Sequence, residues 1–151
     1  EFRRVLFRSE EFKKIFRIRK AFDDRSDDLA DGSARDAATK EMEAQLRLAL
    51  GERRFAEYKR GLDADYQQLY RTVQRYDLPS ESAAKLYEIK KAAEEQRRAL
   101  ENNTQLIGEQ RDAAMKAMTA EVVRGVRQIL GEKGFKYLQS RGGDWLLVPG
   151  E

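Results

Sequence analysis

The sequence predicts an all-α protein: two repeated helical hairpins joined by a bridging helix and packed as an antiparallel or open bundle. Apolar residues recur at helical spacing through most of the chain, and only two prolines interrupt it. Charged residues make up 38% of the 151 residues, against roughly 25% in ordinary globular chains. Two long stretches also read as copies of one another, which predicts a repeated architecture.

The first nine residues, EFRRVLFRS, match the translation of a short-read sequencing adapter, so we set residues 1–9 aside as an artefact. Without their three arginines and one glutamate, 27 basic and 26 acidic residues remain, and the formal charge falls from +3 to +1. This balance removes the electrostatic footprint that nucleic-acid binding requires, so no nucleic-acid partner is expected. We expect the native N-terminus, with any signal or membrane anchor, to lie upstream of this segment.

Residues 10–60 are predicted to form the first hairpin. Its first arm carries a stripe at helical spacing with one polar interruption: Ile15, Ile18, Phe22, Arg25 and Leu29. The polar string 31–33 marks the bend. The second arm carries the apolar residues Met42, Leu46, Ala49 and Leu50.

Residues 61–79 are predicted to form a bridging helix and a turn. The stripe of this helix is Leu62, Tyr66, Leu69, Val73 and Tyr76, with Asp63 as its N-cap. The turn is predicted at Leu78 and Pro79, because a residue before proline is pushed out of helical geometry. Pro79 then suits the first turn of a new helix, with Ser80 and Glu81 at its start.

Residues 80–141 are predicted to form the second hairpin, bent at the polar string 101–104. Adding 71 to the numbers of the first-arm stripe gives Leu86, Ile89, Ala93, Gln96 and Leu100. Adding 80 to the second-arm positions and to Phe55 gives Val122, Val126, Ile129, Leu130 and Phe135. Both hairpins end in the same Leu-Gly-Glu-x-x-Phe string, which predicts that each Gly closes a helix in the left-handed region and each Phe folds back onto its hairpin.

Residues 142–151 form the C-terminal tail. Gly142 and Gly143 are expected to let the chain turn, so that Trp145, Leu146 and Leu147 lie against the bundle. We interpret Trp145 as a closing packing residue, with a partner anchor as the alternative.

Catalytic chemistry has few candidates in this sequence. The chain contains neither His nor Cys, which excludes the usual triads and thiolate metal sites. Its carboxylates fall at spacings that pair with Lys and Arg along helices, so we predict no enzyme, and a carboxylate-dependent enzyme remains the less favoured alternative. No cofactor or catalytic residue is expected.

The densest acidic stretch, residues 23–31, was tested as a calcium loop. Starting at Asp27, the spacing places Leu29 where an oxygen ligand is needed and Ala38 where the bidentate glutamate belongs. The loop motif fails, and only weak divalent-cation binding by clustered carboxylates stays open. Five tyrosines, at 58, 66, 70, 76 and 87, are predicted to pack at half-buried helix edges.

The turn 106–111 and the string 130–132 resemble the LTxxQ helical-hairpin proteins of bacteria, the periplasmic Spy and CpxP group, with Ile107 in place of the capping Thr. A closer resemblance covers nearly all of residues 10–146. The strings EFKKIFRIRKAFDD, LGE-x-x-F/Y-x-x-Y and GG-x-WL are similar to membrane-anchored extracytoplasmic proteins of Verrucomicrobia-like bacteria that have no characterised function. The resemblance implies a location in the periplasm or envelope and a chaperone-like or stress-related role.

The favoured hypothesis is therefore a non-enzymatic interaction module of the bacterial envelope that binds a protein partner or an unfolded client. Its candidate binding face is Ile15, Phe16, Leu86 and Tyr87, where an aromatic residue beside each aliphatic stripe widens the apolar surface. The alternative is that all four are core residues. The competing function is a cytoplasmic helical scaffold or self-assembling protein, in which homo-oligomers form. A membrane is expected only through an upstream anchor, because no run of the roughly eighteen apolar residues that a span needs is present.

Overall fold

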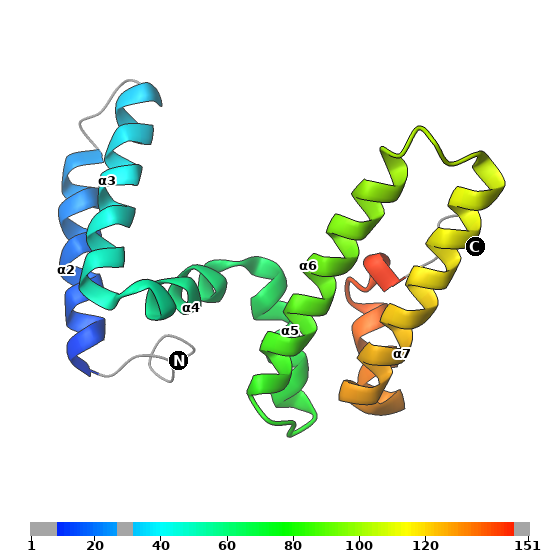
Figure 1. The fold of residues 1–151 in the computed structure, drawn as a ribbon. Helices are drawn as coiled ribbons and strands as arrows, with labels where there is room; N and C mark the ends of the chain where they lie inside the picture. Colours follow the sequence, from blue (N-terminus) through cyan, green and yellow to red (C-terminus); the bar gives the residue numbers. More distant parts are fainter. Residues whose placement is uncertain (1–8, 27–31, 147–151) are drawn as a thin grey trace. The chain divides into compact units, whose positions relative to one another are not determined.

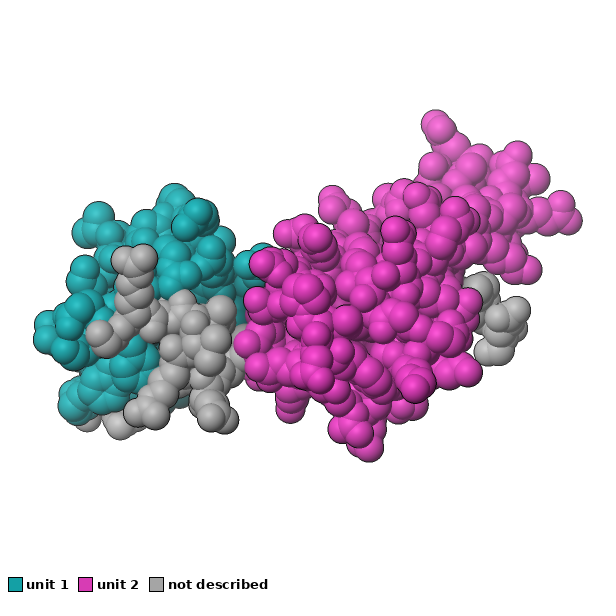
Figure 2. Space-filling view, turned by 90° about the horizontal axis from the view of Figure 1, so that it is seen from below, with its two compact units in different colours: residues 1–63 teal, residues 64–151 magenta. Residues whose placement is uncertain are grey.

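The computed structural model describes residues 9–26 and 32–146, and these residues are all-helical, which confirms the predicted fold class (Figure 1). Six α-helices, one 3-10 turn and no strand occur among them. The chain divides into two compact units, residues 1–63 and residues 64–151, shown in teal and magenta in Figure 2. Each unit is therefore described by itself.

Unit 1 contains α2 (Ser9–Ser26), α3 (Gly32–Leu50) and α4 (Glu52–Leu62). Helices α2 and α3 lie side by side as a hairpin, drawn in blue and cyan in Figure 1, and α4 packs on α3. The residues buried between these helices are Ile15, Leu46, Phe55 and Tyr58, with Ile18, Met42 and Leu50 packed against them. Tyr58 was predicted to be half-buried and is instead 7% exposed. Burial of this apolar stripe is the main force that holds the helices together.

Unit 2 contains α5 (Ala64–Arg75), α6 (Glu81–Glu101), α7 (Gly108–Ser140) and the 3-10 turn η1 (Asp144–Leu146). Helices α6 and α7 form the second hairpin, α5 packs on both, and η1 packs on α6 and α7. Its buried apolar residues include Tyr66, Leu69, Val73, Leu86, Val126, Leu130, Phe135, Leu138 and Leu146.

Both junction glycines have a positive φ, as predicted, but their ψ values of 160° at Gly51 and 174° at Gly131 are not those of the left-handed helical conformation. Gly51 has φ 76° and Gly131 has φ 65°, backbone values that glycine adopts without a Cβ clash. Gly51 separates α3 from α4, whereas Gly131 breaks α7 into two helical segments that follow one another directly. In the order of the chain, the segment 132–140 follows Gly131 as α4 follows Gly51.

The side chains around both junctions make the same contacts. Arg47 pairs with Glu52 at 3.4 Å and lies over the ring of Phe55, 4.9 Å from its centroid. Eighty positions later, Arg127 pairs with Glu132 at 3.7 Å and lies over the ring of Phe135 at 4.5 Å. Each Phe is buried. The arginine thus joins the end of the long helix to the start of the short one by charge and by a cation–π contact.

Helix α5 differs from the bridge that the sequence predicts. It begins at Ala64, directly after Asp63, whose extended backbone (φ −72°, ψ 127°) is that of an N-cap residue. Three residues of the predicted stripe, Tyr66, Leu69 and Val73, are buried, whereas Leu62 is 42% exposed at the end of α4 and Tyr76 lies in the turn after α5. Because this stripe packs on α6 and α7, the boundary between the units falls before α5, and the helix belongs to unit 2 rather than standing between the hairpins.

The turn between α5 and α6 is longer than predicted. Asp77 has φ 52°, and the amide of Leu78 donates to the carbonyl of Val73 at 3.0 Å, which closes α5. Pro79 and Ser80 stay in the turn, and α6 begins at Glu81. The Ser80 side chain makes no capping hydrogen bond, so this residue does not have the capping role that a serine usually takes.

The loop between α6 and α7 falls at the predicted polar string. The amide of Gln105 donates to Asn103 Oδ1 at 2.9 Å, and Arg111 donates to the carbonyls of Asn103 and Leu106. At the start of α7 the Gln110 side chain accepts from the amide of Ile107 at 3.4 Å. This is the half of a capping box that does not need a hydroxyl, so the helix starts in place without the Thr of the LTxxQ motif.

The C-terminal segment turns at Gly142, which has φ 124°. Leu146 is 3% exposed and Trp145 is half-buried, so Leu146 rather than Trp145 is the main closing residue. Arg97 of α6 holds the segment by donating to the carbonyl of Trp145 at 3.2 Å. Leu147, also predicted to pack here, lies outside the described residues.

Candidate protein-binding face

The four residues of the candidate face differ in exposure. Ile15 is 7% exposed and Leu86 is fully buried, each in the core of its own unit. Tyr87 is half-buried, and Phe16 is 58% exposed. Phe16 is therefore the residue of this set that presents most of its side chain to solvent.

Phe16 has an aromatic neighbour that the sequence reasoning missed. Phe12 lies one helical turn earlier on α2 and is 40% exposed. Residues four apart lie on the same side of a helix, so the two rings form one exposed apolar strip. The i to i+4 spacing is the signal that would have identified Phe12, whereas Ile15 and Ile18 point the adjacent side of α2 into the core.

The exposed strip lies in a basic stretch. Residues 12–20, FKKIFRIRK, contain five basic residues and no acidic one. Lys13 pairs with Glu10 at 2.7 Å and Lys20 with Asp24 at 3.0 Å, but all four side chains are more than half exposed. Such surface pairs contribute only about 0–1 kcal/mol, so a bound carboxylate can replace them at little cost.

Tyr87, in contrast, is engaged within unit 2. Its ring meets the ring of Tyr66 on α5 edge to face, with centroids 5.6 Å apart. The ammonium group of Lys91 lies 5.2 Å from the centroid of the Tyr87 ring. These contacts account for the half-burial of Tyr87, and α5 is the element that provides the covering aromatic ring.

Beside Tyr87, two lysines of α6 bind one carboxylate of α5. Lys90 Nζ lies 2.6 Å from Asp65 Oδ1, and Lys91 Nζ lies 3.7 Å from Asp65 Oδ2. Glu94 pairs with both lysines from the next turn, at 3.7 and 3.4 Å. The Lys90 side chain is only 11% exposed, so its charge is held by these partners in a largely desolvated position.

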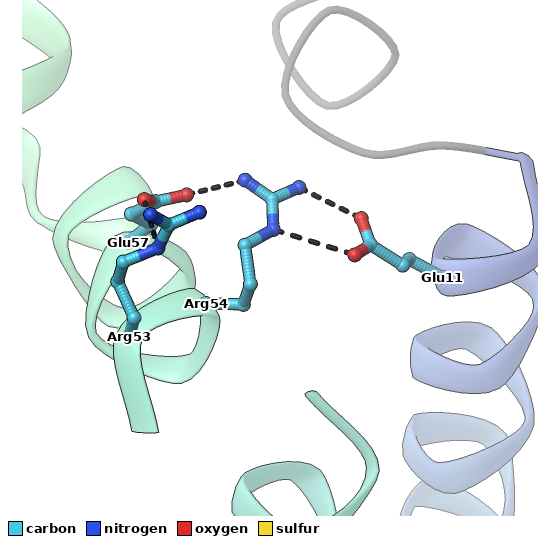
Figure 3. A network of polar contacts seen from close by, with 4 residues as sticks. All are labelled: Glu11, Arg53, Arg54 and Glu57. Carbon is cyan, nitrogen blue, oxygen red and sulfur yellow. Dashed lines mark hydrogen bonds and ion pairs between the residues drawn. The ribbon is translucent and has the colours of Figure 1, made fainter. Parts of the chain in front are cut away.

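A second polar network joins α2 to α4 in unit 1, and Figure 3 shows it from close by. Arg54 donates from two nitrogens to the two oxygens of Glu11, at 2.7 and 3.4 Å, and from its third nitrogen to Glu57. The hydrogen bond to Glu11 raises the pKa of Arg54, against the opposing effect of burial. Arg53 pairs with Glu57 at 3.9 Å but is 88% exposed. The network fixes α4 against α2. Glu11 and Arg54 are 43 residues apart in the sequence, so no local sequence pattern predicts their contact.

The acidic stretch 23–31 is described only in part. Asp23 and Asp24 are exposed on the last turns of α2, while residues 27–31 lie outside the described part of the chain. Within residues 9–26 and 32–146, no group of three or more acidic, His or Cys side chains is placed to hold a metal ion. None of the helices in these two ranges has the apolar length that a membrane span requires.

The fold and the exposed strip on α2 define an all-helical protein with an aromatic, basic surface. A scan against protein-family models and searches of curated proteins and solved structures found no match for the chain.

Proposed function

We propose that this chain is a non-enzymatic helical interaction module of the bacterial cell envelope. Its binding surface is the α2 face, which we define as Phe12, Phe16, Arg19 and Lys20. The exposure of two phenylalanines one turn apart carries this proposal, because monomeric proteins bury most of their aromatic surface and aromatic residues are enriched at interfaces.

The energetics of the α2 face fit a protein partner or an unfolded client with both apolar and acidic groups. The exposed fractions of Phe12 and Phe16, 40% and 58%, together equal about one whole side chain. Burial of one such side chain contributes about 1.5–3 kcal/mol. A micromolar complex requires about 8 kcal/mol, so the neighbouring cations and additional contacts must contribute the rest.

Aggregation of reduced insulin provides the first test. We expect the wild-type chain to suppress light scattering at near-stoichiometric amounts and the double variant Phe12→Ser/Phe16→Ser to lose most of that effect. Leu48→Ser is the matched control, because it also replaces an exposed apolar residue by serine, but on α3 and away from the α2 face. Leu48 is 90% exposed. Equal suppression by wild type and double variant would contradict the assigned surface, and no suppression at any ratio would end the chaperone-like version.

The envelope location rests on the resemblance to extracytoplasmic proteins. A fusion of the native gene product to alkaline phosphatase tests it, because this enzyme needs disulfides that form outside the cytoplasm. We expect an active fusion in intact bacteria. An inactive fusion combined with concentration-dependent self-association in sedimentation would support the cytoplasmic scaffold instead.

A further inference from the structure

The first helices of the two hairpins correspond along their length. With the offset of 71, residues 10–20 of α2 align with residues 81–91 of α6, and the four residues of the α2 face fall on four residues of α6. Phe12, Phe16, Arg19 and Lys20 correspond to Ala83, Tyr87, Lys90 and Lys91. The aromatic residue and the two adjacent cations thus recur at the same spacing.

On α6, this surface is the docking site of α5. Tyr87 packs edge to face on Tyr66 of α5, and Lys90 and Lys91 both pair with Asp65 of α5. Ala83 is fully buried. In unit 2 the surface is therefore covered by an amphipathic helix that brings an aromatic ring and, one residue before it, a carboxylate.

On α2, the two phenylalanines of the corresponding surface are exposed, while Arg19 donates to Tyr58 Oη at 3.4 Å. Helix α4 does not take the place of α5, because it follows the Gly51 junction and corresponds to the segment 132–140 of α7. It contacts α2 through Arg54 and Tyr58, which bond to Glu11 and Arg19. Phe12 and Phe16 keep 40% and 58% of their surface exposed beside these contacts.

We propose that the α2 face binds an amphipathic helix of a partner protein with the chemistry of α5. That helix presents aromatic and aliphatic residues at the spacing of Tyr66, Leu69, Tyr70 and Val73, and an aspartate just before the first of them. This inference rests on the proposed function and names the class of partner. Charge complementarity supports it, since the positions of Lys90 and Lys91, which bind the α5 carboxylate, are again basic in α2.

The substitutions between the two surfaces fit this partner. Phe12 in place of Ala83 adds apolar area, and Phe16 in place of Tyr87 keeps a ring available for an edge-to-face contact. Arg19 in place of Lys90 offers a planar guanidinium that binds a carboxylate with two hydrogen bonds. Each change keeps or strengthens the ability to receive an α5-like helix.

A peptide of residues 63–77, acetylated, amidated and labelled with fluorescein, is the probe. We measure its fluorescence anisotropy on titration with the whole chain. We expect saturable binding to the wild-type chain. Phe16→Ser should weaken this binding at least about tenfold, as truncation of a central aromatic anchor does. The control Leu48→Ser should leave the binding unchanged. Circular dichroism checks that each variant keeps its helix content.

A charge swap tests the ionic contact. A peptide with Asp65→Lys should bind the wild-type chain at least about tenfold more weakly, as loss of a charged contact at an interface does. The chain with Arg19→Glu and Lys20→Glu should restore its binding. A swapped pair that binds no better than the mismatched pair would overturn the proposal.

Three further results would overturn it. Absence of binding by the wild-type peptide, or binding that Phe16→Ser leaves unchanged, would show that the α2 face does not receive this helix. A dimer that forms without peptide and is lost in Phe16→Ser would place a second copy of the chain there. These outcomes are separate from the insulin assay, since aggregation suppression that depends on Phe12 and Phe16 without peptide binding would keep the proposed function and reject only this partner.

Discussion

Units 1 and 2 share a junction and differ in what covers the hairpin. In both, an arginine pairs with a glutamate and lies over a buried phenylalanine after a glycine of positive φ. In unit 2, α5 and η1 pack on the hairpin, and Tyr87 is half-buried. In unit 1, the corresponding Phe16 is 58% exposed. The comparison teaches that the face beside the buried stripe is covered by a helix in unit 2, whereas in unit 1 its aromatic residues are exposed and form a candidate interface.

The largest expected effect comes from the buried phenylalanines of the junctions. Phe55→Ala and Phe135→Ala should each destabilise their own unit by about 3–5 kcal/mol, the range for deleting a buried phenyl ring. The two rings are 5% and 2% exposed, so we expect similar costs. Urea denaturation followed by circular dichroism measures both. A cost below about 1 kcal/mol in one unit would show that the two junctions are not equivalent.

The junction glycines give the next effect. Gly51→Ala and Gly131→Ala should each cost about 1–2 kcal/mol, because an alanine at positive φ is strained. Apart from the adjoining backbone, the described residues place nothing within 4 Å of a Cβ added at either position, so backbone strain sets the cost. Gly125→Ala is the control. Gly125 lies inside α7, and the Cβ of an alanine there would contact Ile89 Cδ1 of α6 at an ordinary distance of 3.7 Å. This substitution should be neutral or stabilising, because alanine favours the helix. A shift in melting temperature that is equal for all three variants would contradict this explanation.

Lys90, the lysine of α6 that pairs with Asp65 of α5, gives a further test of the comparison between the two units. Lys90→Ala should destabilise unit 2 by about 0.5–1.5 kcal/mol, because it removes the nearest cation of Asp65, which keeps only the longer pair with Lys91 at 3.7 Å. Arg19→Ala at the corresponding position of unit 1 should cost less, about 0.5 kcal/mol, because its hydrogen bond to Tyr58 Oη is long, at 3.4 Å. Chemical denaturation of the two variants measures the difference. Equal costs would mean that Tyr58 holds Arg19 as firmly as Asp65 holds Lys90, and that Arg19 does not offer its charge to a partner.

The smallest effect concerns the link between α2 and α4. Arg54→Lys should cost about 0.5–1 kcal/mol, since an ammonium group cannot donate to both oxygens of Glu11 and to Glu57 in the geometry of the guanidinium group. Arg53→Lys is the matched control in the neighbouring position, where the side chain is 88% exposed, and should have no measurable effect. If both variants behave alike, the network of Figure 3 does not stabilise unit 1.

Much of the fold follows from the sequence because helical spacing and glycine punctuation are local signals. The stripes of α2 and α6, the bend before Gln105 and the positive φ of glycines 51 and 131 were all predicted from them. The placement of α5 was not, because an amphipathic helix has the same stripe whichever hairpin it packs on. The Leu78–Pro79 signal located the turn but not its length, since the positive φ of Asp77 depends on how the chain leaves α5.

The candidate site could be predicted only in part. Phe16 was selected because an aromatic beside an aliphatic stripe widens the apolar face, yet the same rule selected Tyr87, which α5 covers. Exposure depends on which neighbours pack alongside, and that information is not local. Ile15 and Leu86 are buried in the cores of their units, so the part of the predicted face that a partner can reach is Phe16 on α2.

Hydrogen exchange of the whole chain, with and without the peptide of residues 63–77, tests most directly whether the α2 face is an open counterpart of the α5 docking site. We expect the peptide to slow amide exchange along residues 9–26 while residues 81–101 keep their exchange rates, because α6 is already covered by α5. Slowed exchange along residues 81–101, or no change along residues 9–26 at saturating peptide, would contradict it.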